Sequence, residues 1–319
     1  MASPIRAHRI PIFVLVAIVL AVLALLLAAP RSAAAYEPID LREGQDRSTT
    51  PQDREAVQEL LRELAADQDP ESSPTPTPSP TPAPTAAPPG YDISYPQCGK
   101  DYPEEFSFAI VGVNGGRVHS ENPCLGPGDH PSQLEWAGRD AELYANTGNP
   151  GPQLSRYWPR GQADPRPCDA RDGADTVDCA YDYGWNAAAH AYDVALQASL
   201  DLEWADEEAD RIPGDPTWWL DVEDANSWRG DRGLNVAALE GAVAFLESMD
   251  AEVGFYSTPR LWDRITGGTD VFAEHPAWHA GAANREDAQA RCDDESFTGG
   301  ELRLVQWVEN GVDANVRCR

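Results

Sequence analysis

The chain has little positive charge. It carries 24 lysine and arginine residues against 53 aspartates and glutamates, and Lys100 is its single lysine. The formal net charge at pH 7 is −29. Proteins bind nucleic acids and anionic membrane surfaces through basic patches, so this composition argues against both kinds of partner.

Several chemical signatures are also missing. The sequence contains no Gly-x-Ser-x-Gly elbow, no phosphate-binding loop and no Cys-x-x-Cys pair. These absences remove support for an esterase, a nucleotide enzyme, a zinc ribbon or a thioredoxin-like redox site. His275 and His279 stand four residues apart, but on a predicted strand and loop rather than on one helix face. We therefore expect no metal site and no cofactor.

No cysteine occurs before residue 90, and six follow it: Cys98, Cys124, Cys168, Cys179, Cys292 and Cys318. An even number of cysteines in an exported domain predicts disulfides, here three of them. Proximity in sequence favours pairing each cysteine with its neighbour along the chain, although six cysteines permit many other pairings.

The N-terminus carries an export signal. Residues 12–29 form an uninterrupted apolar run, preceded by Arg6 and Arg9. The run is just long enough to span a bilayer, whereas Ala33-Ala34-Ala35 suits cleavage by signal peptidase. A cleaved signal peptide and a retained membrane anchor both remain open. Both place the rest of the chain outside the cytoplasm, either secreted or anchored to the outer face of the membrane.

Composition divides the chain into four parts. Residues 1–35 are the signal peptide or anchor, and residues 36–70 are an acidic stalk with a short helix beginning at Thr50-Pro51. Residues 71–90 are a linker rich in Pro and Thr that cannot bury a core. Such a linker is extended at about 3 Å per residue, so it spans on the order of 60 Å. Residues 91–319 are the predicted catalytic or binding domain.

Apolar strand-like runs alternate with helical patterns in this last part. Helices are expected at 132–146, where Ser132 and Glu135 make a capping box, at 182–204, after Asn235, and after Thr258-Pro259. Strands are expected at 91–95, 108–113, 153–157, 217–222, 252–256, 277–280, 303–307 and 312–316. The alternation predicts an α/β fold, a single (β/α) barrel of the TIM type. Little helix separates the last three strands, so we expect the barrel to be irregular there.

Two acids end one of these strands. In Trp218-Trp219-Leu220-Asp221-Val222-Glu223, residues Asp221 and Glu223 stand two apart and so project from the same face. Adjacent carboxyl groups push their pKa values apart, so one stays protonated near neutral pH. A glycosidase needs such an acid to protonate the departing sugar oxygen. Solvated acids at a strand end are the alternative interpretation.

The order of the motifs resembles glycoside hydrolase family 25. Gly90-Tyr91-Asp92-Ile93-Ser94 comes first, Leu220-Asp221-Val222-Glu223 is central, and Val312-Asp313-Ala314-Asn315 closes the chain. Phe255-Tyr256-Ser257-Thr258 and Pro276-Ala277-Trp278-His279-Ala280 are also similar to segments of that family. The resemblance implies a lysozyme-type muramidase that cuts β-1,4 bonds in peptidoglycan or a related cell-wall polysaccharide.

The resemblance also assigns roles by position. Glu223 matches the general acid, and Asp221 matches the acid that orients the acetamido group or stabilises developing positive charge. Asp92 matches the acid of the first strand and Asp313 the acid near the last strand. Asp92 as a strand-end hydrogen-bonding residue and Asp313 as a turn cap are the competing interpretations. Among the aromatic residues, those expected to bind sugar are Trp278, Trp307 and Tyr256.

Two departures from the family leave a second function open. The segment between the last aromatic strand and Asp313 is reduced to Val308-Glu309-Asn310-Gly311, and residues 157–215 form an insertion. A non-catalytic wall-binding or carbohydrate-binding module on the same barrel is therefore the alternative.

Overall fold

The computed structural model of the protein describes residues 87–168, 174–205, 212 and 216–318. The predicted export segment, the stalk helix and most of the predicted linker lie outside this part of the chain. Within the described residues, the structure contains no helix with the length and hydrophobicity needed to cross a membrane.

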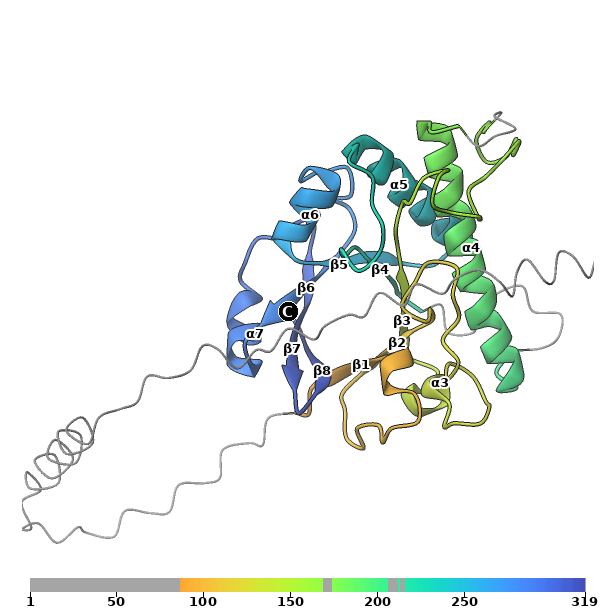
Figure 1. Ribbon diagram of the computed structural model, residues 1–319. Coiled ribbons are helices and arrows are strands. Elements are labelled where there is room, and N and C mark those ends of the chain that lie inside the picture. Colours follow the sequence, from red (N-terminus) through yellow and green to blue (C-terminus); the bar gives the residue numbers. More distant parts are fainter. Residues whose placement is uncertain (1–86, 169–173, 206–211, 213–215, 319) are drawn as a thin grey trace, which may run out of the picture. The chain divides into compact units, whose positions relative to one another are not determined.

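Eight strands form a closed barrel in chain order (Figure 1). Consecutive strands from β1 to β7 pair in parallel, whereas β8 pairs antiparallel with both β7 and β1. The predicted barrel is thus confirmed, and its irregularity lies where the sequence places it. The strands are β1 (Gly90–Ile93), β2 (Ala109–Gly112), β3 (Glu142–Asn146), β4 (Trp218–Asp221), β5 (Val253–Ser257), β6 (Ala277–Ala282), β7 (Leu302–Glu309) and β8 (Val312–Arg317).

Side chains alternate between the two faces of each strand. On β4, Trp218 and Leu220 join the apolar cluster that the outer helices cover, whereas Trp219 points into the barrel. Inside, Trp219 packs edge-on against Trp278 at a ring-centroid distance of 5.7 Å, together with Ile110. The interior is therefore filled with side chains, and it leaves space for a site only at an end.

Helices cover part of the outer surface. They are α3 (Gln133–Ala137), α4 (Val177–Asp201), α5 (Arg232–Ser248), α6 (Pro259–Thr266) and α7 (Arg285–Arg291), with a 3₁₀ turn, η1, at Tyr95–Gln97. Helices α4 and α5 lie side by side (Figure 1), in close backbone contact. A Cβ added at Gly184 would lie 1.7 Å from the Ala238 carbonyl oxygen, and one at Gly241 would lie 2.0 Å from that of Tyr181.

The prediction for residues 132–157 is wrong in part. Ser132 does cap a helix, accepting a hydrogen bond from the Glu135 N–H, but that helix ends at Ala137 because Gly138 adopts a φ of 84°. Residues 142–146, predicted as helix, form β3, and residues 153–157, predicted as strand, form turns. The Pro150-Gly151-Pro152 sequence just before them favours a turn over a strand.

The other helix predictions hold with shifted boundaries. The helix expected at 182–204 begins at Val177 because the Thr176 hydroxyl caps it. Asn235 is not a helix cap: Asp231 caps α5, and Asn235 is buried within it, donating to the Ile265 carbonyl. Thr258 caps α6 as predicted.

The predicted disulfides are confirmed. Cys98 pairs with Cys124, Cys168 with Cys179, and Cys292 with Cys318, so no described cysteine is free. Disulfides of this kind persist in oxidising compartments, which supports export of this domain.

Candidate active site

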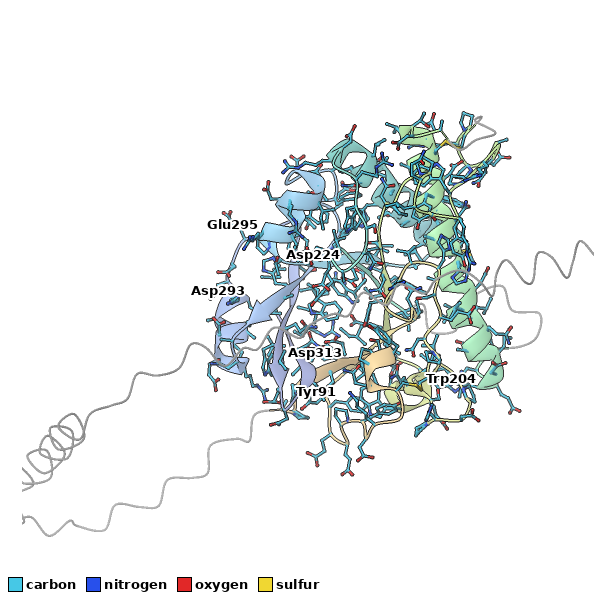
Figure 2. The ribbon with its side chains drawn as sticks, viewed as in Figure 1. Tyr91, Trp204, Asp224, Asp293, Glu295 and Asp313 are labelled. Atoms are coloured by element: carbon cyan, nitrogen blue, oxygen red, sulfur yellow. A yellow bond between two sulfur atoms is a disulfide. The ribbon has the colours of Figure 1, made fainter. Side chains whose placement is uncertain are left out.

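Four acids converge at one end of the barrel. Asp92 and Asp221 lie at the carboxyl ends of the parallel strands β1 and β4, and Glu223 follows β4. Because β8 runs antiparallel, its second residue, Asp313, reaches the same end and stands opposite Asp92. Figure 2 shows Asp313 on β8 beside Tyr91 of β1. The barrel thus gathers side chains that are distant in sequence.

These four residues, which we call the acid cluster, line a cleft of about 200 Å³ together with Tyr95, Tyr144 and Asn146 among others. A larger hollow of about 790 Å³ lies beside the Cys292–Cys318 disulfide, but it contains no comparable group of acids. We place the candidate site in the smaller cleft because the ionisable side chains are there.

Asp221 is buried in this cleft, with 6 % of its surface exposed. Its Oδ2 accepts a hydrogen bond of 2.5 Å from the Asn146 amide, while its Oδ1 is buried and has no partner among the described residues. Burial, and then the neighbouring Glu223 carboxylate, hold the pKa of Asp221 well above its ordinary value. The free oxygen is suited to receive a hydrogen bond from a bound molecule.

Glu223 lies next to Asp221 but is half-buried. Its main-chain carbonyl accepts a hydrogen bond of 2.6 Å from the indole N–H of Trp228, which fixes the backbone at this point. Burial raises the pKa of Glu223, and the carboxylates of Asp224 and Asp313 raise it further. A glutamate with a raised pKa keeps its proton closer to neutral pH, as a general acid requires.

Asp92 and Asp313 form a second pair of acids. Asp92 is 5 % exposed, and burial followed by the Asp313 carboxylate raises its pKa from 3.8 to about 8. Two amides, Gln306 and Asn315, donate hydrogen bonds to Asp92. Burial likewise raises the pKa of Asp313.

The three aromatic residues expected to bind sugar lie in three different environments. Trp278 is 1 % exposed and packs inside the barrel against Tyr144 and Tyr256, so it supports the site from within and presents no open face. Tyr256 is partly exposed, and its hydroxyl donates to Gln306. Trp307 does not reach the cleft. It belongs to the apolar cluster outside the barrel because its neighbour Gln306 takes the inward position.

Several residues of the cleft were not predicted from the sequence. Asn146 and Tyr144 fall in the segment assigned to a helix, so their position on a strand was not visible. Tyr95, which is 46 % exposed, falls in the strand predicted at 91–95, whereas in the structure it begins the 3₁₀ turn η1 that follows β1. Asn315 stands in the quoted motif Val312-Asp313-Ala314-Asn315, and Gln306 precedes Trp307, but no local signal shows that both contact Asp92.

The acid cluster does not have the spacing of a metal site. Among the described residues, the one group whose ligand atoms lie within 4.8 Å of one another is Cys98, Cys124 and His130. Both of its sulfur atoms are joined in a disulfide and so are not thiolate ligands.

Comparison with known proteins gives similarity over part of the chain. The family model Lys-1, lysozyme-like protein 1, matches residues 215–299. Probable GH family 25 lysozyme 4 of Dictyostelium discoideum is 33 % identical over 93 residues, which cover 29 % of this chain and 42 % of that protein. Probable GH family 25 lysozyme 2 of the same organism is 37 % identical over 62 residues, covering 19 % of this chain and 29 % of that protein. The matched stretch is thus less than half the length of these relatives.

Among solved structures, the chain is similar to a muramidase from Trichobolus zukalii, with 16 % identity and a TM-score of 0.43 over 72 % of this chain and 93 % of that one. The Lys-1 match includes β4 with Asp221, and Glu223 just after it, and it excludes Asp92 and Asp313. The chain is therefore similar, over part of its length, to lysozyme-like proteins and to proteins named as family 25 lysozymes, and the Lys-1 match contains its Leu-Asp-Val-Glu motif.

Proposed function

We propose that the protein is a lysozyme-like glycoside hydrolase that cleaves β-1,4 bonds in peptidoglycan. The observation that carries this proposal is the acid cluster at one end of a closed barrel, with Asp221 and Glu223 inside the segment that matches the lysozyme-like family model. A related cell-wall polysaccharide is the nearest alternative substrate.

In this mechanism Glu223 protonates the glycosidic oxygen as the bond breaks. Its raised pKa supports this role, because the acid must hold a proton to donate it. The unpartnered Oδ1 of Asp221 accepts a hydrogen bond from the acetamido N–H of the substrate and orients that group. Asp92 and Asp313 shape the charge around the sugar, and an ionised carboxylate of this pair stabilises positive charge as it develops.

The sequence and the disulfides support a location outside the cytoplasm. We propose that the domain acts outside the cytoplasmic membrane, secreted or held there by the apolar run at residues 12–29. The extended Pro/Thr linker then allows the domain to extend from the membrane toward the cell wall. Contact with the membrane is limited to the N-terminal apolar segment.

The test is turnover of purified peptidoglycan sacculi by the full-length protein. We expect soluble fragments whose new reducing ends are N-acetylmuramic acid, detected by mass spectrometry. Glu223→Gln should remain folded and lose this activity, whereas Glu286→Gln, an exposed substitution on α7, should retain it. Equal turnover by wild type and Glu223→Gln would remove Glu223 from this role.

One observation favours a second function, binding without cleavage. A tight turn at Asn310 and Gly311, both with positive φ, joins β7 to β8, so this connection adds no wall to the cleft. An open cleft of this kind is compatible with affinity without turnover. Co-sedimentation with sacculi, combined with no released fragments after long incubation, would favour the binding module.

A further inference from the structure

Asp92 is held by two amides on the same oxygen. Its Oδ1 accepts a hydrogen bond of 3.0 Å from Gln306 Nε2 and one of 2.6 Å from Asn315 Nδ2. Both donors come from the last two strands, β7 and β8, and all three side chains are buried. Two donors on one oxygen fix the rotation of the carboxyl group and leave Oδ2 for the cleft that Asp92 lines.

Each amide is in turn held by an aromatic donor. The Trp278 indole N–H donates to Asn315 Oδ1 at 2.8 Å, and the Tyr256 hydroxyl donates to Gln306 Oε1 at 2.8 Å. An indole nitrogen can only donate, so Asn315 must present its oxygen to Trp278 and its N–H₂ to Asp92. A tyrosine hydroxyl both donates and accepts, so Gln306 is held less strictly.

The groups that face Asp92 add no positive charge. They are the carboxyl groups of Asp313 on β8 and Asp221 on β4, and the phenols of Tyr144 on β3 and Tyr256 on β5. No lysine, arginine or histidine takes part among the described residues. The amides therefore hold the carboxyl group in place of an ion pair.

We propose that Gln306 and Asn315 are positioning residues that orient Asp92, and that Tyr256 and Trp278 fix the direction of these two amides. We call this set the amide clamp. Its consequence for catalysis rests on the function proposed above, whereas its effect on Asp92 itself does not.

If the amide clamp orients Asp92, its loss should change the pKa of Asp92 as well as turnover. Hydrogen bonds from the two amides favour the ionised form of Asp92 and lower its pKa, against burial and Asp313, which raise it. Removing a donor should therefore raise the pKa of Asp92. A residue that only fills space would leave this pKa unchanged.

The experiment uses full-length protein with ¹³C-labelled aspartate carboxyl groups, titrated by NMR, with the Asp92 signal assigned from Asp92→Asn. Gln306→Met should raise the pKa of Asp92 and lower kcat/KM about tenfold, mainly through kcat. Tyr256→Phe removes one hydroxyl only. It should raise the pKa of Asp92 and lower kcat/KM, each by less than Gln306→Met does. Val308→Thr, an exposed substitution on β7, is the control and should change neither.

An unchanged or lowered pKa of Asp92 in folded Gln306→Met would overturn the proposal. If Gln306→Met does not fold, Tyr256→Phe decides in its place. If the wild type shows no turnover, the proposed function fails, and the NMR titration still tests the clamp.

Discussion

At the scale of single residues, the site is built from acids and neutral amides. Asn146 holds Asp221, and Gln306 and Asn315 hold Asp92. An arginine in these places would favour the ionised acids strongly and lower their pKa values. Amides fix the same geometry and lower the pKa values less. The acids therefore stay protonated to a higher pH, and a glycosidase can use such a proton.

The first prediction concerns Asp313 and the pH dependence of activity. The Asp313 carboxylate is one of the groups that raise the pKa of Glu223. Asp313→Asn should lower that pKa, so Glu223 loses its proton at a lower pH. Because the proposed mechanism needs protonated Glu223, the alkaline limb of the kcat/KM profile should move to lower pH. Glu286→Gln serves as control, and a limb that stays in place or moves to higher pH would contradict this account.

At the scale of elements, the barrel depends on close backbone contacts as well as on apolar faces. Helices α4 and α5 approach closely because glycine stands at their contact. A methyl group at Gly184 would meet the Ala238 carbonyl, which belongs to the backbone and cannot rotate away. The glycine is therefore required by packing, with no special φ.

Gly184→Ala should accordingly destabilise the domain, by about 3 kcal/mol, the upper part of the range for overpacked sites. Chemical denaturation monitored by tryptophan fluorescence measures the difference. Gly230→Ala is the matched control, since a Cβ there meets no atom within 4 Å. Equal stability of the two variants would show that α4 and α5 can separate without cost.

Local signals predicted much of this architecture. The alternation of strand and helix patterns predicted the barrel. The two-residue spacing of Asp221 and Glu223 predicted that both side chains lie on the same side of the strand. The helix expected through residue 146 failed because Gly138 ends α3, and this error hid Asn146 and Tyr144. In the amide clamp, Gln306 is separated from Asp92 by 214 positions in the sequence, and Asn315 by 223. Such pairs form only when β8 closes the barrel, and no local pattern encodes them.

At the scale of the whole molecule, the net charge affects how the protein meets a substrate outside the cell. The net charge of −29 gives the chain a repulsive interaction with other polyanions. Peptidoglycan itself carries carboxylates on its peptide stems, so a protein that acts on it works against electrostatic repulsion.

Salt should therefore improve the encounter with sacculi. At an ionic strength of about 0.1 M the Debye length is about 10 Å, so added salt screens the repulsion. We expect KM for sacculi to fall severalfold between low salt and about 0.2 M, with kcat little changed. A neutral oligosaccharide substrate should show no such dependence. A KM for sacculi that is constant or rises with salt would contradict the prediction.

The measurement that tests the central claim most directly compares two leaving groups. Wild type and Glu223→Gln are each assayed on the glycan and on an aryl glycoside of the same sugar with a dinitrophenyl leaving group, which departs without protonation. If Glu223 is the general acid, the substitution should lower turnover of the glycan by roughly 10²–10⁴-fold and that of the dinitrophenyl glycoside far less. Equal loss on both substrates would contradict the assignment of Glu223 as the proton donor.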